Sequence, residues 1–233
     1  MVDVSRPTAL VTGASRGIGL AVAEDLARTH DVVLVGRSGE SLQRVAHDLP
    51  GASVLVLDVA DEHAVDYAVL PDRLDVLVHA AGISEHGTVE EVSRGDWRQV
   101  FETNVFGVAH LTARALPALR GASGTVVLVN SGAGLFSTPG NSVYSASKFA
   151  LRTFGDCLRE EERENGVRVV SIHPGIVDTD MGRAVLERRE GGRPERMIAP
   201  ETIAAAVRTA VDAPPEAQFE TVSIRPTLDP KGP

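Results

Sequence analysis

Cysteine, lysine and tyrosine are scarce in this sequence, and long apolar runs are missing. Its 233 residues contain one cysteine, two tyrosines and two lysines, against 21 arginines. The single cysteine, Cys157, excludes a disulfide within the chain and fits a reducing compartment. No run of about 18 apolar residues occurs, so we expect no membrane span. Residues 1–7 lack the basic start and apolar centre of a signal peptide, which favours a cytoplasmic protein.

The charge and the histidines argue against two further classes of function. The formal net charge is −9, whereas a nucleic-acid backbone requires a basic face on its partner. The seven histidines show no metal-ligand spacing, so we expect no metal. Hydrophobic residues make up 43% and charged residues 24%, which is ordinary for a globular protein. The length is sufficient for one domain, residues 1–233, with a full core.

Short apolar runs alternate with longer segments of helical period. The apolar runs predict strands at 8–12, 32–35, 54–57, 76–78, 126–129, 167–172 and 221–224. Helices are expected at 17–29, 40–48, 61–69, 97–119, 142–164 and 200–212. This alternation predicts an α/β protein with a doubly wound parallel sheet and helices on both faces. Residues 178–199 are the most irregular stretch, which we interpret as a mobile substrate flap near the ligand edge of the sheet.

The first predicted strand runs into a glycine-rich turn, Thr12-Gly13-Ala14-Ser15-Arg16-Gly17-Ile18-Gly19. Glycines let a backbone turn tightly and approach a pyrophosphate, and a following helix offers free N–H groups. The spacing is G-x-x-x-G-x-G rather than the more common G-x-G-x-x-G. A glycine-rich turn in an unrelated α/β protein is the alternative, but its position between strand and helix favours a dinucleotide site.

One of the two tyrosines and one of the two lysines lie four residues apart, at Tyr144 and Lys148. In a helix, residues at this spacing lie on one face with Cβ atoms roughly 5–6 Å apart. A tyrosine has an ordinary pKa of about 10. An ammonium at about 4 Å, at an effective dielectric constant near 20, contributes about 4 kcal/mol. This predicts that Lys148 lowers the pKa of Tyr144 by close to three, towards neutrality.

These motifs resemble those of the short-chain dehydrogenase/reductase family. The glycine-rich turn is similar to its cofactor loop, and Tyr144-x-x-x-Lys148 to its catalytic pair. Further similarities follow in the family's order over about residues 8–180: Asp58-Val59, His79-Ala80-Ala81-Gly82, Asn104-Val105-Phe106-Gly107, Ser131 and Pro174-Gly175. The resemblance implies a Rossmann-type fold and hydride transfer between a nicotinamide cofactor and a small-molecule carbonyl or alcohol.

The resemblance also implies a set of catalytic residues. Tyr144 would protonate the carbonyl oxygen during reduction, Lys148 would contact the ribose hydroxyls, and Asn104 would hold a water in the proton relay. Ser131, 13 residues before Tyr144, would donate a hydrogen bond to the substrate oxygen. Two alternatives stay open from the residues alone. Ser131 also suits a turn, and an asparagine within a helix can mark a bend or a buried polar bridge.

Cofactor choice depends on the end of the second strand. A carboxylate there favours NAD, whereas arginine accommodates the 2′-phosphate of NADP. The chain has Arg37 and no carboxylate at that position, so we expect NADP(H), with NAD(H) possible; the alternative is that Arg16 and Arg37 merely face solvent. By the resemblance, the cofactor contacts are Gly13, Ser15, Arg16, Gly17, Ile18, Gly19, Arg37, Asp58, Val59, Ala81, Gly82, Asn104, Tyr144, Lys148, Pro174, Gly175, Ile176 and Thr179.

The substrate is less well defined than the reaction. By the resemblance, its pocket is formed by Ser131, Leu135, Phe136, Asn141, Tyr144, Gly175, Met181 and Val185. Two positions depart from the family pattern, because His79 and His173 stand where asparagine is usual. We expect both to serve as structural hydrogen-bonding groups rather than catalytic ones. The chain also ends without the glycine-rich tail of many members that reduce carrier-bound oxoacyl chains, which weakens that assignment.

Three functions therefore remain in order of preference. The first is an NADP(H)-dependent carbonyl reductase or alcohol dehydrogenase. The others are NAD-dependent oxidation of a hydroxy acid or amino alcohol, and a non-catalytic NADP-binding regulator. The resemblance also implies a homodimer or homotetramer formed by the helices near 97–119 and 142–164. The apolar residues available for that contact, or equally for the core, are Val105, Val108, Leu111, Phe149, Leu151 and Phe154.

Overall fold

The structure is a computed structural model that describes residues 6–188 and 191–230. Residues 189–190, inside the predicted flap, and Lys231, the second lysine, lie outside the described residues. Within the described ranges, no helix is both long and apolar enough to cross a membrane.

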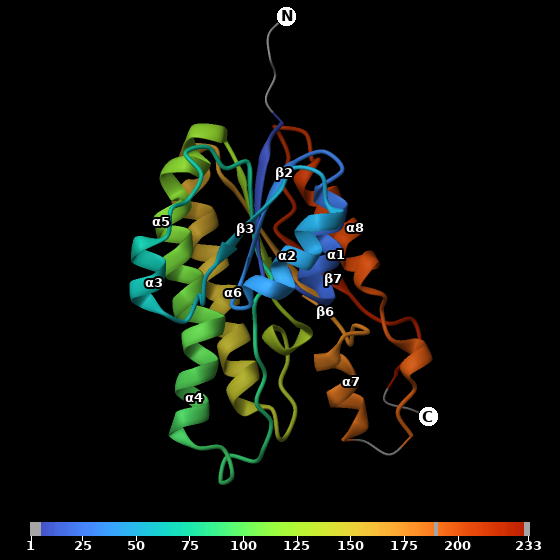
Figure 1. The fold of residues 1–233 in the computed structure, drawn as a ribbon. Helices are drawn as coiled ribbons and strands as arrows, with labels where there is room; N and C mark the ends of the chain where they lie inside the picture. The colour runs from blue at the N-terminus through green and yellow to red at the C-terminus, as the bar shows by residue number, and fades with distance from the viewer. Residues whose placement is uncertain (1–5, 189–190, 231–233) are drawn as a thin grey trace, which may run out of the picture.

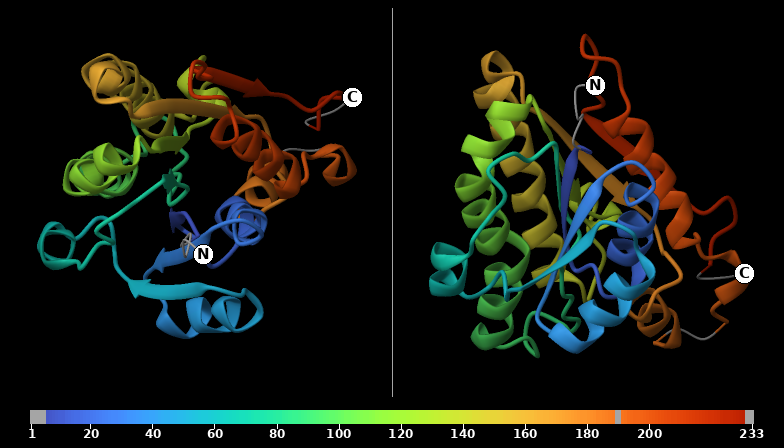
Figure 2. Two further views of the ribbon diagram at one scale, coloured as in Figure 1. Left: turned by 90° about the horizontal axis from the view of Figure 1, so that it is seen from above. Right: turned by 45° about the horizontal axis from the view of Figure 1, so that its top comes forward.

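Seven parallel strands form one twisted sheet in the order β3-β2-β1-β4-β5-β6-β7. They are β1 (Thr8–Thr12), β2 (Asp31–Gly36), β3 (Ala52–Val56), β4 (Val76–His79), β5 (Thr125–Val129), β6 (Arg168–Pro174) and β7 (Thr221–Ile224). Seen from above, β3 and β7 lie at opposite edges of the sheet (Figure 2). The predicted doubly wound, Rossmann-type sheet is therefore confirmed, including its last strand.

Helices cover both faces of the sheet (Figure 1). They are α1 (Gly17–Leu26), α2 (Gly39–Asp48), α3 (Glu62–Tyr67), α4 (Arg94–Phe101), α5 (Gly107–Ala122), α6 (Ser142–Glu162), α7 (Asp180–Glu187) and α8 (Pro200–Val211). Apolar residues of α1, α2 and α8 pack on one face, and those of α3, α5 and α6 pack on the other. The central strands are buried on both faces, which explains their continuous valine-rich runs.

Two features differ from the helices expected from sequence. The helix expected at 97–119 starts earlier and is interrupted by a π-helical turn, η1 (Glu102–Phe106), between α4 and α5. The segment interpreted as an irregular flap contains α7 and a short 3₁₀ turn, η4 (Pro194–Arg196). Thr179 starts α7, because its hydroxyl accepts a hydrogen bond from the backbone N–H of Gly182.

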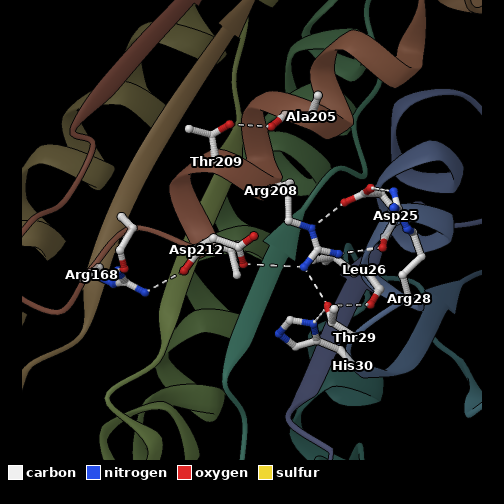
Figure 3. Close-up of polar contacts among 12 residues, drawn as sticks. Asp25, Leu26, Arg28, Thr29, His30, Arg168, Ala205, Arg208, Thr209 and Asp212 are labelled. Carbon is white, nitrogen blue, oxygen red and sulfur yellow. Dashed lines mark hydrogen bonds and ion pairs between the residues drawn. The ribbon is translucent and has the colours of Figure 1, made fainter.

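Helices α1 and α8 lie side by side and are joined by polar side chains (Figure 3). Arg208 of α8 donates from Nε to the carboxylate of Asp25 at 2.7 Å and from Nη2 to the Asp25 carbonyl at 2.6 Å. Its Nη1 donates to the Thr29 hydroxyl at 2.6 Å. This contact fixes the helix that follows the glycine-rich loop against the helix that follows the α7 segment.

Candidate active site

Two cavities lie at the carboxyl edge of the sheet and share part of their walls. The glycine-loop cavity has a volume of about 500 Å³ and extends from the glycine-rich loop to Lys148. The Ser131 cavity has a volume of about 660 Å³ and lies between the segments after β5 and β6 and helix α7. The residues that line both cavities are Ile18, Asn130, Tyr144, Thr179 and Met181. A group bound in one cavity would therefore lie beside a group bound in the other.

Thr12, at the end of β1, joins the loops that follow β1 and β4. Its hydroxyl oxygen accepts hydrogen bonds from the backbone N–H groups of Ala80 and Ala81, both at 3.1 Å. Strands β1 and β4 are neighbours at the point where the strand order reverses direction. Open α/β sheets bind their ligands at this switch point.

The glycine-rich loop lies so close to its neighbours that two of its glycines leave no room for a side chain. A Cβ atom on Gly13, which has φ +68°, would lie 2.9 Å from Cα of Ala81. A Cβ on Gly19 would collide with the Gly13 carbonyl. Helix α1 then begins without a side-chain cap, which leaves its first N–H groups available for an anion.

Tyr144 and Lys148 lie one turn apart on α6, where Lys148 is buried and Tyr144 is half-buried. The Lys148 Nζ lies 5.7 Å from the centre of the Tyr144 ring and donates to the Val129 carbonyl at 3.0 Å. Burial lowers the pKa of Lys148 to about 8. The ammonium is therefore held at the end of β5, in the wall of the glycine-loop cavity.

The expected lowering of the Tyr144 pKa by Lys148 is wrong for the structure described. Burial has the largest effect and raises the pKa of Tyr144, while a hydrogen bond with Ser131 lowers it less. The physical reason is that removal from water disfavours the phenolate, and the Lys148 ammonium is directed towards a backbone carbonyl. The phenol is therefore held in its protonated form.

Ser131 begins the one-turn 3₁₀ helix η2 (Gly132–Gly134), directly after β5. Its hydroxyl oxygen accepts from the backbone N–H of Ala133 at 3.1 Å. The ring of His173 at the end of β6 donates from Nδ1 to the Ser131 carbonyl at 2.8 Å. His173 therefore fixes the Ser131 backbone, and His79 likewise bonds through Nε2 to the Thr112 hydroxyl at 2.9 Å. Both histidines make structural hydrogen bonds, as expected from the sequence.

Asn104 lies in the π-helical turn and is buried. Its side-chain oxygen accepts from the Ile83 backbone N–H at 3.0 Å, and its side-chain nitrogen donates to the Ile83 carbonyl at 2.9 Å. The same nitrogen donates to the Ser147 hydroxyl at 3.1 Å. The amide therefore joins the segment after β4 to α6, as a buried polar bridge. Single π-helical turns inside α-helices are frequent at functional sites.

Arg16 and Arg37, which we expect to bind the 2′-phosphate of NADP, each lie close to a carboxylate. Arg16 pairs with Asp180 at 2.9 Å, and Arg37 lies 3.9 Å from a carboxylate oxygen of Asp58. All four side chains are substantially exposed, so neither pair contributes much stability. Arg16 and Arg37 therefore remain accessible at the wall of the glycine-loop cavity.

Most residues expected to contact the cofactor line the glycine-loop cavity. These are Gly13, Ser15, Arg16, Gly17, Ile18, Gly19, Arg37, Asp58, Val59, Ala81, Gly82, Tyr144, Lys148 and Thr179. Three others, Pro174, Gly175 and Ile176, line the Ser131 cavity instead. Asn104 lines neither cavity and lies behind Gly82, where a Cβ would approach its side-chain oxygen at 3.3 Å.

The expected substrate residues lie in the Ser131 cavity with one exception. Its lining includes Ser131, Phe136, Asn141, Tyr144, Gly175, Met181 and Val185. Leu135 is not among the residues that line this cavity.

The structure brings several residues to the site that no sequence motif indicates. Thr12 and Ser147 were not singled out because a single hydroxyl in a strand or helix carries no distinctive spacing. His86, Arg188, Arg225 and Pro226 line the Ser131 cavity but lie far from the recognised motifs. The pair Arg225-Pro226 follows directly after the predicted last strand, and strand ends form the ligand edge of such a sheet. This position directly after a strand could have indicated that Arg225 and Pro226 lie at the site.

Comparison with known sequences identifies relatives along nearly the whole chain. A family model described as short chain dehydrogenase matches residues 7–190. An uncharacterised oxidoreductase of Staphylococcus epidermidis is 33% identical over 234 residues, which cover 97% of this chain and 100% of that protein. An uncharacterised oxidoreductase of Escherichia coli is 37% identical over 184 residues, covering 76% of this chain and 68% of the relative.

Solved structures show the same arrangement. An alcohol dehydrogenase from the archaeon Thermococcus sibiricus, complexed with 5-hydroxy-NADP, matches with a TM-score of 0.85 and 28% identity, over 96% of this chain and 97% of that one. A serine dehydrogenase from Escherichia coli matches with a TM-score of 0.81 and 27% identity, over 93% of this chain and 96% of that one. With its matching sequence model, parallel sheet and glycine-rich loop, this chain belongs to the short-chain dehydrogenase family.

Proposed function

We propose that this protein transfers a hydride between NADP(H) and a carbonyl or alcohol group of a small molecule, with Tyr144 as general acid or base. The proposal rests mainly on the positions of the Tyr144, Ser131 and Lys148 side chains in the two adjoining cavities. Tyr144 lines both cavities, Ser131 lines one and Lys148 lines the other. Membership of an oxidoreductase family supports this assignment. A regulator that only bound the cofactor would have no need of all three groups.

The glycine-loop cavity suits a nicotinamide dinucleotide. Gly13 and Gly19 allow the close backbone approach that such a ligand requires. The uncapped start of α1 offers N–H groups to a pyrophosphate. When bound, the cofactor supplies or accepts the hydride.

The side chains of the chain itself would handle the proton. Burial keeps the Tyr144 pKa above its ordinary value, so the phenol carries a proton at neutral pH and can donate it to a carbonyl oxygen. The Ser131 hydroxyl, which hydrogen-bonds with Tyr144, can donate to the same oxygen as charge develops on it. We infer that reduction of the carbonyl is the direction favoured by this arrangement. Lys148 would hold the ribose hydroxyls from its place in the glycine-loop cavity.

Arg37 and Arg16 support a preference for NADP(H) over NAD(H). Both line the glycine-loop cavity, and β2 ends without a carboxylate of its own. Asp58 opposes this preference in part, because its carboxylate faces Arg37 at 3.9 Å. We infer that the exposed Arg37 turns to the 2′-phosphate, whose charge exceeds that of the carboxylate.

A cofactor-coupled screen tests the proposed function directly. Ketones, aldehydes and alcohols are offered with NADPH, NADP⁺, NADH or NAD⁺, and nicotinamide absorbance is followed. The expected result is turnover of at least one carbonyl compound, faster with NADPH than with NADH. Measured NADPH binding without turnover of any compound would support the regulator instead.

A further inference from the structure

Arg225 brings a guanidinium group to the wall of the Ser131 cavity. It follows the last residue of β7, and its Cζ lies 4.5 Å from the centre of the Phe136 ring. The guanidinium also rests against Gly132, where a Cβ atom would collide with it. Gly132 is the residue next to Ser131, so the charge lies close to the place proposed for the substrate carbonyl.

The chain leaves the N–H groups of this arginine unused. Most described arginines donate a hydrogen bond or form an ion pair. Among residues 6–188 and 191–230, the arginines with neither are Arg94, Arg98, Arg188 and Arg225. Two of these, Arg188 and Arg225, line the Ser131 cavity. The described lining contains a single carboxylate, on Asp229.

The two cavity arginines also act on neighbouring histidines. Burial lowers the pKa of His86, and the charge of Arg188 lowers it further. Burial is again the largest cause of the lowered pKa of His173, with Arg225 among the charges that add to it. Arg188 and Arg225 therefore add positive potential at these two positions, although burial has the larger effect on both pKa values.

Stacking on Phe136 accounts for the position of Arg225 but leaves its hydrogen-bonding edges free. A guanidinium packed over an aromatic face still presents a planar fork of N–H groups, which matches a carboxylate with two parallel bonds. A role in stacking alone would not require the fork to lie at the cavity wall beside Ser131.

We infer that the Ser131 cavity takes a carbonyl substrate that carries a carboxylate, bound by Arg225, with Arg188 adding to the positive potential. This inference rests on the proposed function, because the carbonyl is placed at Ser131 and Tyr144. In the reaction, the carbonyl carbon of the oxo acid would gain the hydride that bound NADPH supplies, and its oxygen would gain the Tyr144 proton, which a proton from solvent then replaces. The products are a hydroxy acid and NADP⁺.

A binding measurement tests the inference without requiring turnover. Hexanoate and hexanamide, which differ in charge but little in size, are titrated calorimetrically into the protein with NADP⁺ present. We expect hexanoate to bind about tenfold more tightly, and Arg225→Met to abolish that difference. Arg94→Met removes an equally unpartnered arginine outside the cavity and should leave the difference intact. Equal affinities, no binding of either probe, or equal losses in both variants would overturn the inference.

A kinetic comparison then separates the inference from the proposed function. The substrates are 2-, 3- and 4-oxohexanoate and their methyl esters, which together vary the spacing between carbonyl and charge. We expect at least one acid to be reduced more efficiently than its ester. Arg225→Met should raise KM for that acid about tenfold and should change KM for the ester much less. Esters reduced as well as acids would refute the inference and leave the proposed function standing. Tight hexanoate binding without reduction of any compound would refute the function instead.

Discussion

Burial changes the chemistry of individual residues more than their spacing in sequence suggests. The four-residue spacing correctly places Tyr144 and Lys148 on one face of a helix. It does not reveal that the ammonium is directed to the Val129 carbonyl, or that Lys148 is buried and Tyr144 half-buried. Desolvation acts in opposite directions on the two pKa values, since it disfavours the charged form of each group. The pKa values of Tyr144 and Lys148 therefore depend on tertiary packing, which cannot be read from the Tyr-x-x-x-Lys motif.

His79 should make the stability of the protein sensitive to acid. Burial lowers the pKa of His79 to about 3, below its ordinary value of 6.5. The neutral ring therefore stabilises the fold fully above about pH 6.5, and this contribution is lost as the pH falls towards about 3. Between these values, wild type should lose on the order of 1.4 kcal/mol of unfolding free energy per pH unit relative to His79→Asn. Urea denaturation at a series of pH values measures this difference.

The control for His79 is the exposed His47. His47→Asn should follow wild type across the pH series. Parallel stability curves for wild type and His79→Asn would contradict the interpretation, because protonation of His79 would then have no cost in the folded state.

Arg37 should determine the preference between the two nicotinamide cofactors. We expect Arg37→Ser to raise KM for NADPH about tenfold and to leave KM for NADH nearly unchanged, because only NADPH carries the 2′-phosphate. Steady-state kinetics with both cofactors measures the effect. Arg73→Ser removes an arginine paired with Asp75, outside both cavities, and serves as the control. Wild-type protein that uses NADH as efficiently as NADPH would refute the preference.

At the scale of elements, the strands were predictable and the interruptions of helices were not. Runs such as Val126 to Val129 are buried on both faces, so their apolar character alone marks a parallel strand. The π-helical turn is stabilised by long-range contacts of Asn104 with Ile83 and Ser147, which leave no local pattern. Helix α7 contains Gly182, a poor helix former, where a Cβ would collide with the Val177 carbonyl. Tertiary contacts therefore decide the structure of both segments.

The α1–α8 contact should contribute strongly to stability (Figure 3). Arg208 and Asp25 are each only 19% exposed, so loss of the guanidinium leaves a partly buried carboxylate without its main partner. We expect Arg208→Met to lower the unfolding free energy by about 2–3 kcal/mol. Arg28 pairs with the same carboxylate but is 77% exposed, so Arg28→Met should cost less than about 1 kcal/mol. Equal losses in urea denaturation would contradict the importance of the buried contact.

At the scale of the whole molecule, the site is assembled from loops that meet at one edge of the sheet. The glycine-rich loop and the positions of Ser131, Tyr144 and Lys148 could be predicted, because they occur as recognisable motifs in a fixed order. The positions of Arg188 and Arg225 in the cavity wall could not be predicted from the sequence. They depend on how α7 and the segment after β7 fold back over the cavity. Local motifs therefore indicate the proposed reaction, and the tertiary fold shapes the cavity proposed for the substrate.

We propose that the protein assembles into a dimer or tetramer through the faces of α5 and α6. Of the residues considered for this contact, Val108, Leu111 and Leu151 belong to the core, whereas Phe149 is 40% exposed. Phe149→Asp should therefore shift the protein to monomers without unfolding it, because a charge in an apolar interface is costly. Size-exclusion chromatography with light scattering measures the mass. Wild-type protein that is already monomeric at micromolar concentration would refute the proposal.

The kinetics of Tyr144→Phe on a substrate from the screen test directly whether Tyr144 is the proton donor. The variant removes one hydroxyl and retains the ring beside Lys148. Because a positioned general acid typically contributes 10²–10⁴-fold, kcat/KM should fall by about 10³-fold. NADPH affinity, measured separately by fluorescence, should change little. Full activity in Tyr144→Phe would contradict the assignment of Tyr144 as the proton donor.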